Sequence, residues 1–295
     1  MRIDPELAAT VAAVIDEGTL EAAARRLNVS PSAISQRIKS LEQQLGRVLL
    51  VRSKPAAATP AGEAVVRLAR QVALLDHDTA AALDLGEAGE RVVTIPLAVN
   101  ADSMATWFLA PLARLSRRHP VVFDVHRDDQ DFTAALLESG TVMGAVTSQS
   151  TPVAGCRVSP LGVLAYEAVA TPDYVARWLP EGVDAAALAR APLVDFDRRD
   201  GLQTDWLRAR GVVADDLTRH YVPASHDFAL AVVSGLGWGM LPAVQSADAL
   251  ADGRLVRLGD PVISVALYWQ QWNLRSPLLS EIAEEIAAEA ARVLA

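Results

Sequence analysis

Cysteine is nearly absent from this 295-residue chain, and so are the residue clusters that hold metals. Cys156 is the single cysteine, so no intrachain disulfide can form, and the five histidines are scattered rather than grouped at metal-ligand spacing. We therefore expect neither a metal nor another cofactor. We interpret Cys156 as a partly buried spacer rather than a redox switch.

Long apolar runs are also lacking. Hydrophobic residues make up 51% of the chain, which is ample for buried cores, but no stretch reaches the roughly 18 consecutive apolar residues that cross a membrane. The first residues show no pattern of a secretory signal peptide. We expect a globular protein of the cytoplasm with no membrane partner, and its length suggests two or three domains.

Catalytic motifs are missing as well. The sequence contains no nucleophile elbow, no phosphate-binding glycine loop and no cluster of metal ligands. Ser225, His226 and Asp227 are the residue types of a hydrolytic triad, but neighbours on one turn cannot point at one another as nucleophile, base and orienting group must. We therefore expect a protein that is not an enzyme.

What the sequence does contain is a marked separation of charge. The whole chain has a net charge of −9, whereas residues 1–60 hold 8 Lys or Arg against 6 Asp or Glu, net +2, and the remainder is net −11. Between residues 25 and 54, seven basic residues accompany a single acid, Glu42. Only this N-terminal region has the charge to bind nucleic acid, and the acidic remainder would limit non-specific binding elsewhere.

The segment from Thr19 to Gly46 has the pattern of two short helices joined by a tight turn. Thr19 can cap a first helix that ends near Arg26, and residues 28–30 make the turn. Ser30 can cap a second helix that has proline in its first position, where the missing N–H costs nothing. The apolar stripe of the second helix is Ile34, Ile38, Leu41 and Leu45. This arrangement predicts a helix-turn-helix.

The other side of the second helix carries hydroxyls, an amide and cations. Glutamine can make a bidentate contact with adenine and arginine with guanine, while serine and lysine can hold phosphates. Residues 48–52 and the Lys54-Pro55 turn predict a small β wing that can touch phosphates or the minor groove. The candidate DNA-binding residues are Ser30, Ser32, Ser35, Gln36, Arg37, Lys39, Arg52 and Lys54.

Two further helices flank this unit. Residues 4–17, with Asp4 as the cap and Pro5 in the first position, predict a supporting helix. Residues 61–85 carry apolar side chains at alternating steps of three and four, a near-heptad period that favours a helical partner. The apolar stripe can either join two chains or pack on the C-terminal region of its own chain.

Beyond a polar hinge at residues 87–90, strands and helices alternate. Strand patterns at 92–99, 121–127 and 142–148, with helices at 103–118 and 130–139 between them, predict a parallel sheet with right-handed crossovers. A second mixture of strands and helices fills residues 164–258. A strand near 262–270 and a helix at 277–294 return to the first part. Two lobes joined in this way enclose a cleft, and ligands bind beyond the carboxyl ends of such strands.

Polar residues gather at those carboxyl ends. Asn100 offers an amide, and Ser103 is expected to begin a helix whose free N–H groups attract a carboxylate. A ligand with one carboxylate and two cationic groups, such as lysine or arginine, would suit these groups and the nearby aspartates, although each acid is equally well explained as a helix cap or an exposed turn. Trp238 either walls the cleft or lies in the core. The candidate effector-binding residues are Asn100, Asp102, Ser103, Asp128, Asp129, Thr147, Ser148, His226, Asp227 and Trp238.

The stretch VSPSAISQRIKSLEQQLGRVLLVRSKPAAATPAGE resembles the N-terminal signature of LysR-type transcriptional regulators. The Leu-Glu-x-x-Leu-Gly landmark of that signature stands at residues 41–46, and the Thr-x-Ala-Gly landmark stands at residues 59–62. Pro31 occupies a position where many members have glutamine. This departure would shift base readout toward Ser32, Gln36 and Arg37.

Three later segments, AVNADSMATWFLAPL, GAVTSQSTPVAGCRVSPLG and FALAVVSGLGWGMLP, are similar to the ArgP/LysG branch, whose members respond to lysine and arginine. The resemblance implies an α/β protein with an N-terminal winged helix-turn-helix, a long linker helix and a two-lobed effector domain like that of periplasmic binding proteins. The implied domains are residues 1–60 for DNA binding and 61–88 for the linker and dimerisation helix. Residues 91–163 with 264–295 form effector subdomain I, and residues 164–263 form subdomain II.

The same resemblance implies the partners. They are double-stranded operator DNA, a small effector, which is expected to be lysine or arginine, and a second copy of the chain. Two chains are expected to form a homodimer through the linker helix, and two dimers are expected to form a tetramer through the lobes. RNA polymerase is a further partner to expect. The expected target is a basic amino-acid exporter gene. Three alternatives stay open: a LysR-type regulator of another metabolite, a two-lobed binding protein or enzyme, and an architectural DNA-binding protein.

Overall fold

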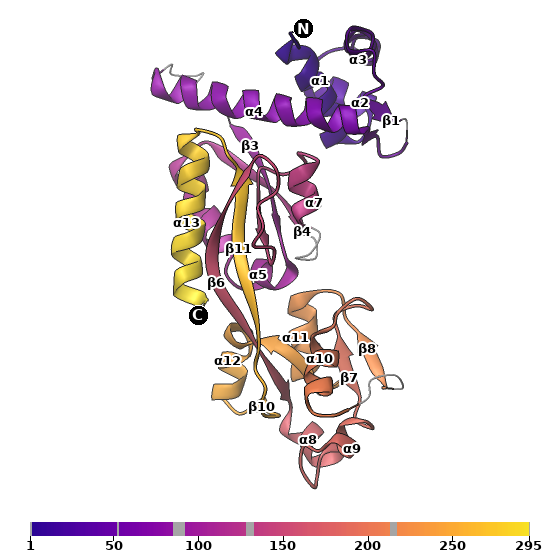
Figure 1. The fold of residues 1–295 in the computed structure, drawn as a ribbon, viewed down its shortest axis with the longest axis vertical. Coiled ribbons are helices and arrows are strands. Elements are labelled where there is room, and N and C mark those ends of the chain that lie inside the picture. Colours follow the sequence, from indigo (N-terminus) through magenta and orange to yellow (C-terminus); the bar gives the residue numbers. More distant parts are fainter. Residues whose placement is uncertain (1, 52, 85–91, 128–132, 213–216, 295) are drawn as a thin grey trace.

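The computed structural model describes residues 2–51, 53–84, 92–127, 133–212 and 217–294. Three parts follow one another along the longest axis of the molecule: a helical N-terminal domain with a long helix, a first α/β lobe and a second α/β lobe (Figure 1). The C-terminal helix α13 (Pro277–Val293) returns to lie along the first lobe, as the sequence predicted.

The N-terminal domain is built on three helices that begin where the caps predicted. These helices are α1 (Pro5–Glu17), α2 (Leu20–Arg26) and α3 (Pro31–Leu45). The side chains of Asp4, Thr19 and Ser30 each accept a backbone N–H at the start of a helix. Gly46 ends α3 with a φ of 63°, a left-handed conformation that glycine adopts without strain. The predicted helix-turn-helix is confirmed.

The wing closes against the same core. Strands β1 (Leu50–Val51) and β2 (Ala57–Ala58) pair antiparallel. The Glu42 carboxylate accepts the Leu49 N–H at 2.8 Å, and a Cβ on Gly62 would lie only 2.0 Å from the carbonyl oxygen of Leu49. Glu42, the acid of the Leu-Glu-x-x-Leu-Gly landmark, therefore accepts a hydrogen bond from the backbone that leads into the wing. Gly62, the glycine of the Thr-x-Ala-Gly landmark, leaves room for that backbone.

The linker helix α4 (Pro60–Ala82) ends three residues before the predicted limit of 85. Its N-terminal half buries Val65 in the core of the DNA-binding domain, and Leu74 reaches the core of the first lobe. Farther along, Leu75 and Leu83 are exposed. Part of the predicted apolar stripe is therefore uncovered in the single chain, and its role in dimerisation stays a prediction.

The first lobe contains a parallel sheet, as predicted. β3 (Val93–Val99) lies between β4 (Val121–Arg127) and β5 (Gly144–Thr147) and pairs parallel with both. The helices that follow these strands are α5 (Ala101–Thr106), α6 (Leu109–Arg118) and α7 (Thr133–Glu138). α13 packs against α6 and completes the lobe. No helix within the described ranges has the length and hydropathy needed to cross a membrane.

The single helix predicted over residues 103–118 is wrong, because the chain forms two helices there. Trp107 and Phe108 separate them, and both side chains are buried in the core. Their backbone N–H groups both bond to the carbonyl oxygen of Ser103. Turning two consecutive aromatic residues inward breaks the helix at a point where the apolar period alone gives no warning.

The second lobe is smaller and more irregular. Its strands are β7 (Leu193–Asp195), β8 (Arg219–Tyr221), β9 (Gly239–Pro242) and β10 (Val256–Arg257). The sequence predicts helices near residues 203–210 and 226–234, and they are present as α10 (Leu202–Ala209) and α11 (Ser225–Val233). The sequence did not predict three others, which are α8 (Pro172–Trp178), α9 (Ala185–Leu188) and α12 (Ala243–Ala251).

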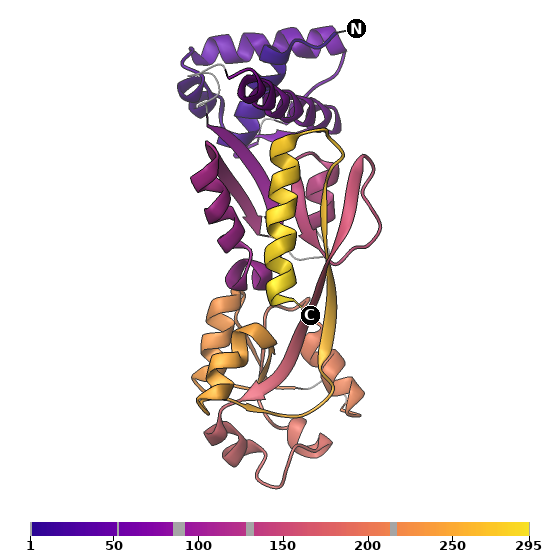
Figure 2. The ribbon, with the colours of Figure 1, turned by 90° about the vertical axis from the view of Figure 1, so that its left-hand side faces the viewer.

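Two long strands join the lobes. β6 (Cys156–Ala170) and β11 (Ile263–Trp272) pair antiparallel and run together from the first lobe toward the second (Figure 2). The sheet has the order β10-β6-β11-β5-β3-β4, and β9 also pairs with β6. The proposed divisions at 163/164 and 263/264 fall inside β6 and at the start of β11. The lobes thus share a continuous strand pair.

Candidate functional sites: a nucleic-acid interface and an interlobe pocket

The exposed face of α3 presents hydrogen-bonding groups at the end of the molecule farthest from the second lobe (Figure 1). Ser32, Gln36 and Lys39 are exposed, and Ser35 is half-buried. The Ser30 hydroxyl caps the helix through the Ala33 N–H and lies 2.8 Å from the Ser32 hydroxyl. An exposed helix face with an amide, hydroxyls and a cation can enter a major groove and contact both bases and phosphates.

Arg37 has a different environment from its neighbours. Its guanidinium lies 2.6 Å from the Glu6 carboxylate at the start of α1, and its side chain is 30% exposed. Arg37 therefore lies at the side of α3, where its charge is paired with Glu6 of the same chain. An exposed pair of this kind contributes little stability, so it would not prevent the predicted contact with a phosphate or a base.

The wing adds a second basic element. Lys54 is exposed in the connection between β1 and β2. The Ser53 hydroxyl donates to the carbonyl oxygen of Pro55 at 2.6 Å and tightens this connection. The other predicted wing contact, Arg52, lies outside the described residues.

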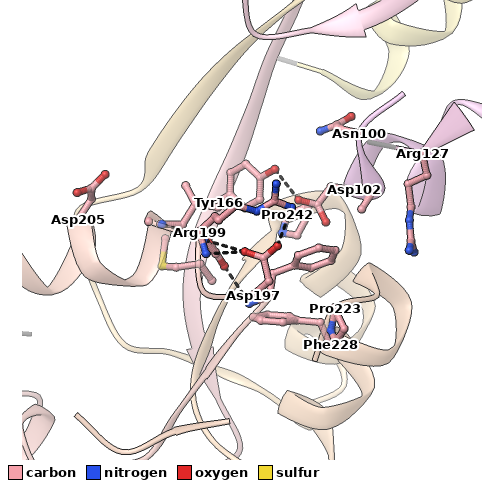
Figure 3. A pocket seen from close by; sticks show the side chains of 16 residues that line it. Asn100, Asp102, Arg127, Tyr166, Asp197, Arg199, Asp205, Pro223, Phe228 and Pro242 are labelled. Carbon is pink, nitrogen blue, oxygen red and sulfur yellow. Dashed lines mark hydrogen bonds and ion pairs between the residues drawn. The ribbon is translucent and has the colours of Figure 1, made fainter. Parts of the chain in front are cut away.

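A cavity of about 570 Å³ lies between the two lobes (Figure 3). Groups from the first lobe, from the crossing strand β6 and from the second lobe all face it. Its lining combines aromatic and aliphatic side chains with several charged ones. The lining residues are Asn100, Ala101, Asp102, Arg127, Tyr166, Phe196, Asp197, Arg199, Asp200, Gly201, Leu202, Asp205, Pro223, Phe228, Met240 and Pro242.

Carboxylates from both lobes meet in this cavity. Asp102, on α5 of the first lobe, accepts a hydrogen bond of 2.7 Å from the Tyr166 hydroxyl on β6. Asp200, on the loop between β7 and α10, accepts the Phe196 and Leu202 N–H groups, each at 3.0 Å. The donors to both carboxylates are thus neutral groups, and the guanidinium groups of Arg127 and Arg199 line the same cavity.

The protonation of the second-lobe acids reflects these surroundings. Burial raises the pKa of Asp200, its two backbone hydrogen bonds oppose the rise, and the negative charge of Asp102 adds to it. The pKa of Asp197 is lowered, first by the Arg199 backbone N–H and also by the Arg199 guanidinium. The ionised form of Asp200 is therefore costly at this place in the fold.

A buried ion pair holds the strand from which this loop begins. Asp195, 2% exposed at the end of β7, pairs with Arg219 on the neighbouring strand β8. Burial raises the pKa of Asp195, and the Arg219 hydrogen bond and charge oppose that rise. Removing one partner would leave a buried charge without compensation. The ion pair therefore holds β7 and β8 together at the point where the loop between β7 and α10 begins.

The first lobe supplies two further polar groups. Asn100 is 5% exposed, lines the cavity and has no hydrogen-bond partner for its side-chain oxygen among the described residues. Arg127, at the carboxyl end of β4, is exposed at the rim. A buried oxygen without a donor is costly, so Asn100 offers a ready site for an N–H of a bound molecule. No group of three or more potential metal ligands occurs in the part of the chain that the structure describes.

The structure brings only some of the predicted effector residues to the cavity. Asn100 and Asp102 line it. Ser103, Thr147 and Trp238 are fully buried, and Ser148 is half-buried. His226 and Asp227 are exposed on α11, whereas their neighbour Phe228 lines the cavity. Asp128 and Asp129 lie outside the described residues.

Two of these predicted residues lie elsewhere for clear physical reasons. Trp238 packs its ring on Trp206, with centroids 4.9 Å apart, so it belongs to the core of the second lobe rather than to the cavity wall. α5 begins at Ala101 rather than at Ser103 and has only six residues. Ser103 is therefore the third residue of the first turn, with a buried side chain, so the prediction that this helix begins at Ser103 is wrong.

The loop after β7 was missed in the sequence, although a signal was present. It reads DFDRRDG over residues 195–201, a charged run directly after a buried strand, and thus meets the same rule that selected Asn100 and Asp102. Tyr166 had no such signal, because a tyrosine inside a long strand is most simply explained as core. Only the crossing of β6 between the lobes brings its hydroxyl to the cavity.

Two family models match the chain. The model described as "Bacterial regulatory helix-turn-helix protein, lysR family" matches residues 6–63. The model of the LysR substrate binding domain matches residues 88–291, well over half of the chain. The chain belongs to the LysR family of bacterial regulators. The helical domain is accordingly the DNA-binding domain, and the two lobes are the ligand-binding domain of a LysR-type regulator.

Individual relatives place it in the LysG/ArgP branch. The crystal structure of ArgP from Mycobacterium tuberculosis is 46% identical, covers 99% of both chains and has a TM-score of 0.85. The lysine export transcriptional regulatory protein LysG from Corynebacterium efficiens is 43% identical over 96% of both chains. LysG from Corynebacterium glutamicum, solved with bound effector Arg, is 34% identical over 99% of both chains, with a TM-score of 0.75. This LysR-type protein is a transcriptional regulator and not an enzyme.

The exposed face of α3 yields a prediction about base reading. Gln36→Ala should weaken binding to a selected operator by about 1–3 kcal/mol, because a bidentate amide contact is lost, and should leave binding to unrelated DNA unchanged. Lys39→Ala should weaken both and lower the salt-dependence slope by about 1, as expected for a phosphate contact. Fluorescence anisotropy at several salt concentrations measures both effects.

Gln43→Ala is the matched control for that experiment, since it removes an exposed amide two turns farther along the same helix. It should bind operator as tightly as the wild type, because recognition helices read bases with their N-terminal residues. If Gln43→Ala lost as much specific affinity as Gln36→Ala, the docking of α3 inferred here would be incorrect.

Proposed function

We propose that this regulator binds a basic amino acid, arginine or lysine, in the interlobe pocket and that the bound effector changes transcription of a basic amino-acid exporter gene. The observation that carries this proposal is the pair of carboxylates, Asp102 and Asp200, that belong to different lobes and line one cavity. Like charges placed near each other in a partly dry site repel, and a cation between them relieves that repulsion.

The rest of the pocket suits the remaining parts of such a ligand. The apolar walls contributed by Phe196, Phe228 and Met240 can cover an aliphatic stem. Asn100 can accept a hydrogen bond from an ammonium or guanidinium group, and Arg127 can pair with the α-carboxylate. A ligand with two cationic groups and one carboxylate thus finds a partner for each of its charges.

The relatives support the same class of effector. The LysG protein of Corynebacterium glutamicum was solved with arginine as its effector, and the Corynebacterium efficiens relative is named for lysine export. The shared two-lobed domain and the acidic pocket of this chain make arginine the first ligand to test and lysine the second. The alternative is a LysR-type regulator that senses a different metabolite. No feature of this pocket favours another metabolite as clearly as the two carboxylates favour a basic amino acid.

The proposed action on DNA follows from the arrangement of the parts. Two chains joined along the exposed stripe of α4 would present two recognition helices to two half-sites, so the operator should be an interrupted palindrome. Lobe contacts between dimers would give the tetramer, a state that sedimentation measures directly. We place this regulator in the cytoplasm with its DNA, where RNA polymerase is a further partner. The effector can act only through its different affinity for the closed and open cleft.

Asp102→Asn tests the carboxylate pair. The amide keeps an acceptor for the Tyr166 hydroxyl but removes the charge, so arginine affinity measured by calorimetry should fall by at least about tenfold, as expected when a hydrogen bond to a charged group is weakened. DNA binding without effector should stay unchanged. The control is Asp205→Asn, an exposed carboxylate at the rim that pairs with Arg208, which should change the affinity by less than about twofold. Equal losses in the two variants would count against the proposed site.

The raised pKa of Asp200 predicts a pH dependence with a definite sign. In the empty pocket, burial and the charge of Asp102 let Asp200 keep its proton at pH values above the ordinary carboxyl range. A cationic ligand needs the ionised form, so binding releases a proton and arginine affinity should fall as the pH is lowered through that raised pKa. Calorimetry in buffers of different ionisation enthalpy measures the released proton. Asp200→Asn should flatten this dependence, and an unchanged profile would refute the assignment.

A further inference from the structure

The contact between the DNA-binding domain and the first lobe is thin. A cavity of about 870 Å³ separates them, with α1 and α4 on one side and β3 on the other. Half of the residues that α4 contributes to this cavity are alanines, Ala69, Ala73 and Ala80, whose small side chains leave the gap unfilled. Apolar packing at this interface is therefore local, as at Leu74, and a few specific polar contacts supplement it.

Arg70 on α4 makes the most extensive of these contacts among the described residues. One guanidinium nitrogen donates to the carbonyl oxygens of Gly140 and Thr141, at 2.5 and 2.6 Å. The other donates to the Asp16 carboxylate at the end of α1, at 2.6 Å. The Arg70 side chain is 12% exposed. One side chain therefore bonds the linker helix to the DNA-binding domain and to the effector lobe at once.

The turn that receives Arg70 is shaped for close approach to α4. Gly140 has a φ of 76°, and a Cβ at this position would lie 2.6 Å from the Cβ of Arg67. The Ser139 and Thr141 hydroxyls lie 2.8 Å apart and brace the turn. The backbone of the effector lobe thus rests directly on the linker helix, one turn away from the Arg70 guanidinium.

On the DNA side, the contact continues toward the recognition helix. Asp16 also pairs with Arg26, the last residue of α2, at 3.1 Å. Only the short turn from residue 27 to residue 30 separates Arg26 from α3. A displacement of Arg70 would therefore change the position of Asp16 and Arg26, at the junction between the two helices of the DNA-binding motif.

On the effector side, the contact continues toward the pocket. Residues 140–141 lead into β5, whose first residue, Gly144, pairs with Leu97 of β3. β3 ends beside Asn100 and Asp102, two residues that line the interlobe cavity. A single sheet thus connects the turn that Arg70 holds with the wall that would meet the effector.

We propose that Arg70 is a positioning residue that locks the effector lobe onto the DNA-binding domain and passes the state of the pocket to the recognition helix. The locking part stands on the contacts of Arg70 alone, whereas the transmission part rests on the proposed effector function. Arginine suits this role because its planar fork satisfies two carbonyl oxygens and one carboxylate together, which the compact ammonium of lysine cannot do with the same geometry.

Hydrogen exchange of the whole protein without any effector tests the locking. In Arg70→Ala, amides of residues 139–143 and of the end of α1 should exchange faster by about threefold or more, because the local opening of both segments becomes easier. Arg70→Lys should fall between this variant and the wild type. Arg67→Ala is the matched control, since it removes a neighbouring charge from α4 but keeps the Cβ that faces Gly140, and it should exchange like the wild type. Exchange in Arg70→Ala equal to that of the wild type would overturn the proposal.

The transmission is tested by the ratio of operator affinities with and without arginine, measured alongside arginine binding by calorimetry. Arg70→Ala should bind arginine within about twofold of the wild type, yet its affinity ratio should move most of the way to one, because coupling needs a connected element. Arg67→Ala should keep the wild-type ratio. An unchanged ratio in Arg70→Ala, or an equal loss in Arg67→Ala, would overturn the transmission.

A failure of the proposed effector function gives a different result. In that case the wild type itself shows no arginine or lysine binding in calorimetry, whereas the exchange comparison of Arg70→Ala with Arg67→Ala still decides whether Arg70 locks the two domains. The two arms therefore separate an error in the identity of the effector from an error in the role of Arg70.

Discussion

The proposed binding of a cationic effector in the interlobe cavity depends on two carboxylates that the fold brings together. Asp102 and Asp200 come from different lobes, and each is held by neutral donors, the Tyr166 hydroxyl for the first and two backbone N–H groups for the second. Burial and the negative charge of Asp102 raise the pKa of Asp200, so the charge of Asp200 is costly at this place. A cation that satisfies both would also draw the lobes toward each other. In the proposed function, recognition of charge and change of shape are thus two aspects of one interaction.

In the proposed mechanism, the remainder of the molecule connects that interaction to the DNA-binding domain. The lobes share the strand pair β6 and β11, so a change in cleft width must be taken up by these strands or by the loops beside them. The first lobe meets the DNA-binding domain across a partly empty interface, in which Arg70 makes three hydrogen bonds. Loosely packed contacts with a few directional bonds suit a protein that must adopt more than one arrangement, since they can break without loss of a core.

Much of the DNA-binding domain could be predicted from the sequence because its rules are local. Caps such as Ser30, stops such as Gly46 and the apolar period of α3 define the helices within a residue or two. The cavity is different, because its residues are distant in sequence. Asn100 and Asp102 followed from the rule for strand ends, and the acids after β7 would have followed from the same rule. Tyr166 and the core position of Trp238 depend on how β6 crosses and how α10 packs, which no local pattern records. The break at Trp107 has the same cause, since burial of two adjacent aromatic side chains outweighed helix periodicity.

Thermal unfolding of the wild-type protein against the twenty amino acids tests the central claim most directly. A ligand at 100 times its dissociation constant stabilises the folded state by about 2.7 kcal/mol, which is a readily visible shift in the midpoint. The paired carboxylates predict a shift with arginine, lysine or both, and none with neutral or acidic amino acids. A shift with a neutral or acidic amino acid, or no shift with any of the twenty, would contradict the assignment of the acidic cavity as a site for a basic amino acid.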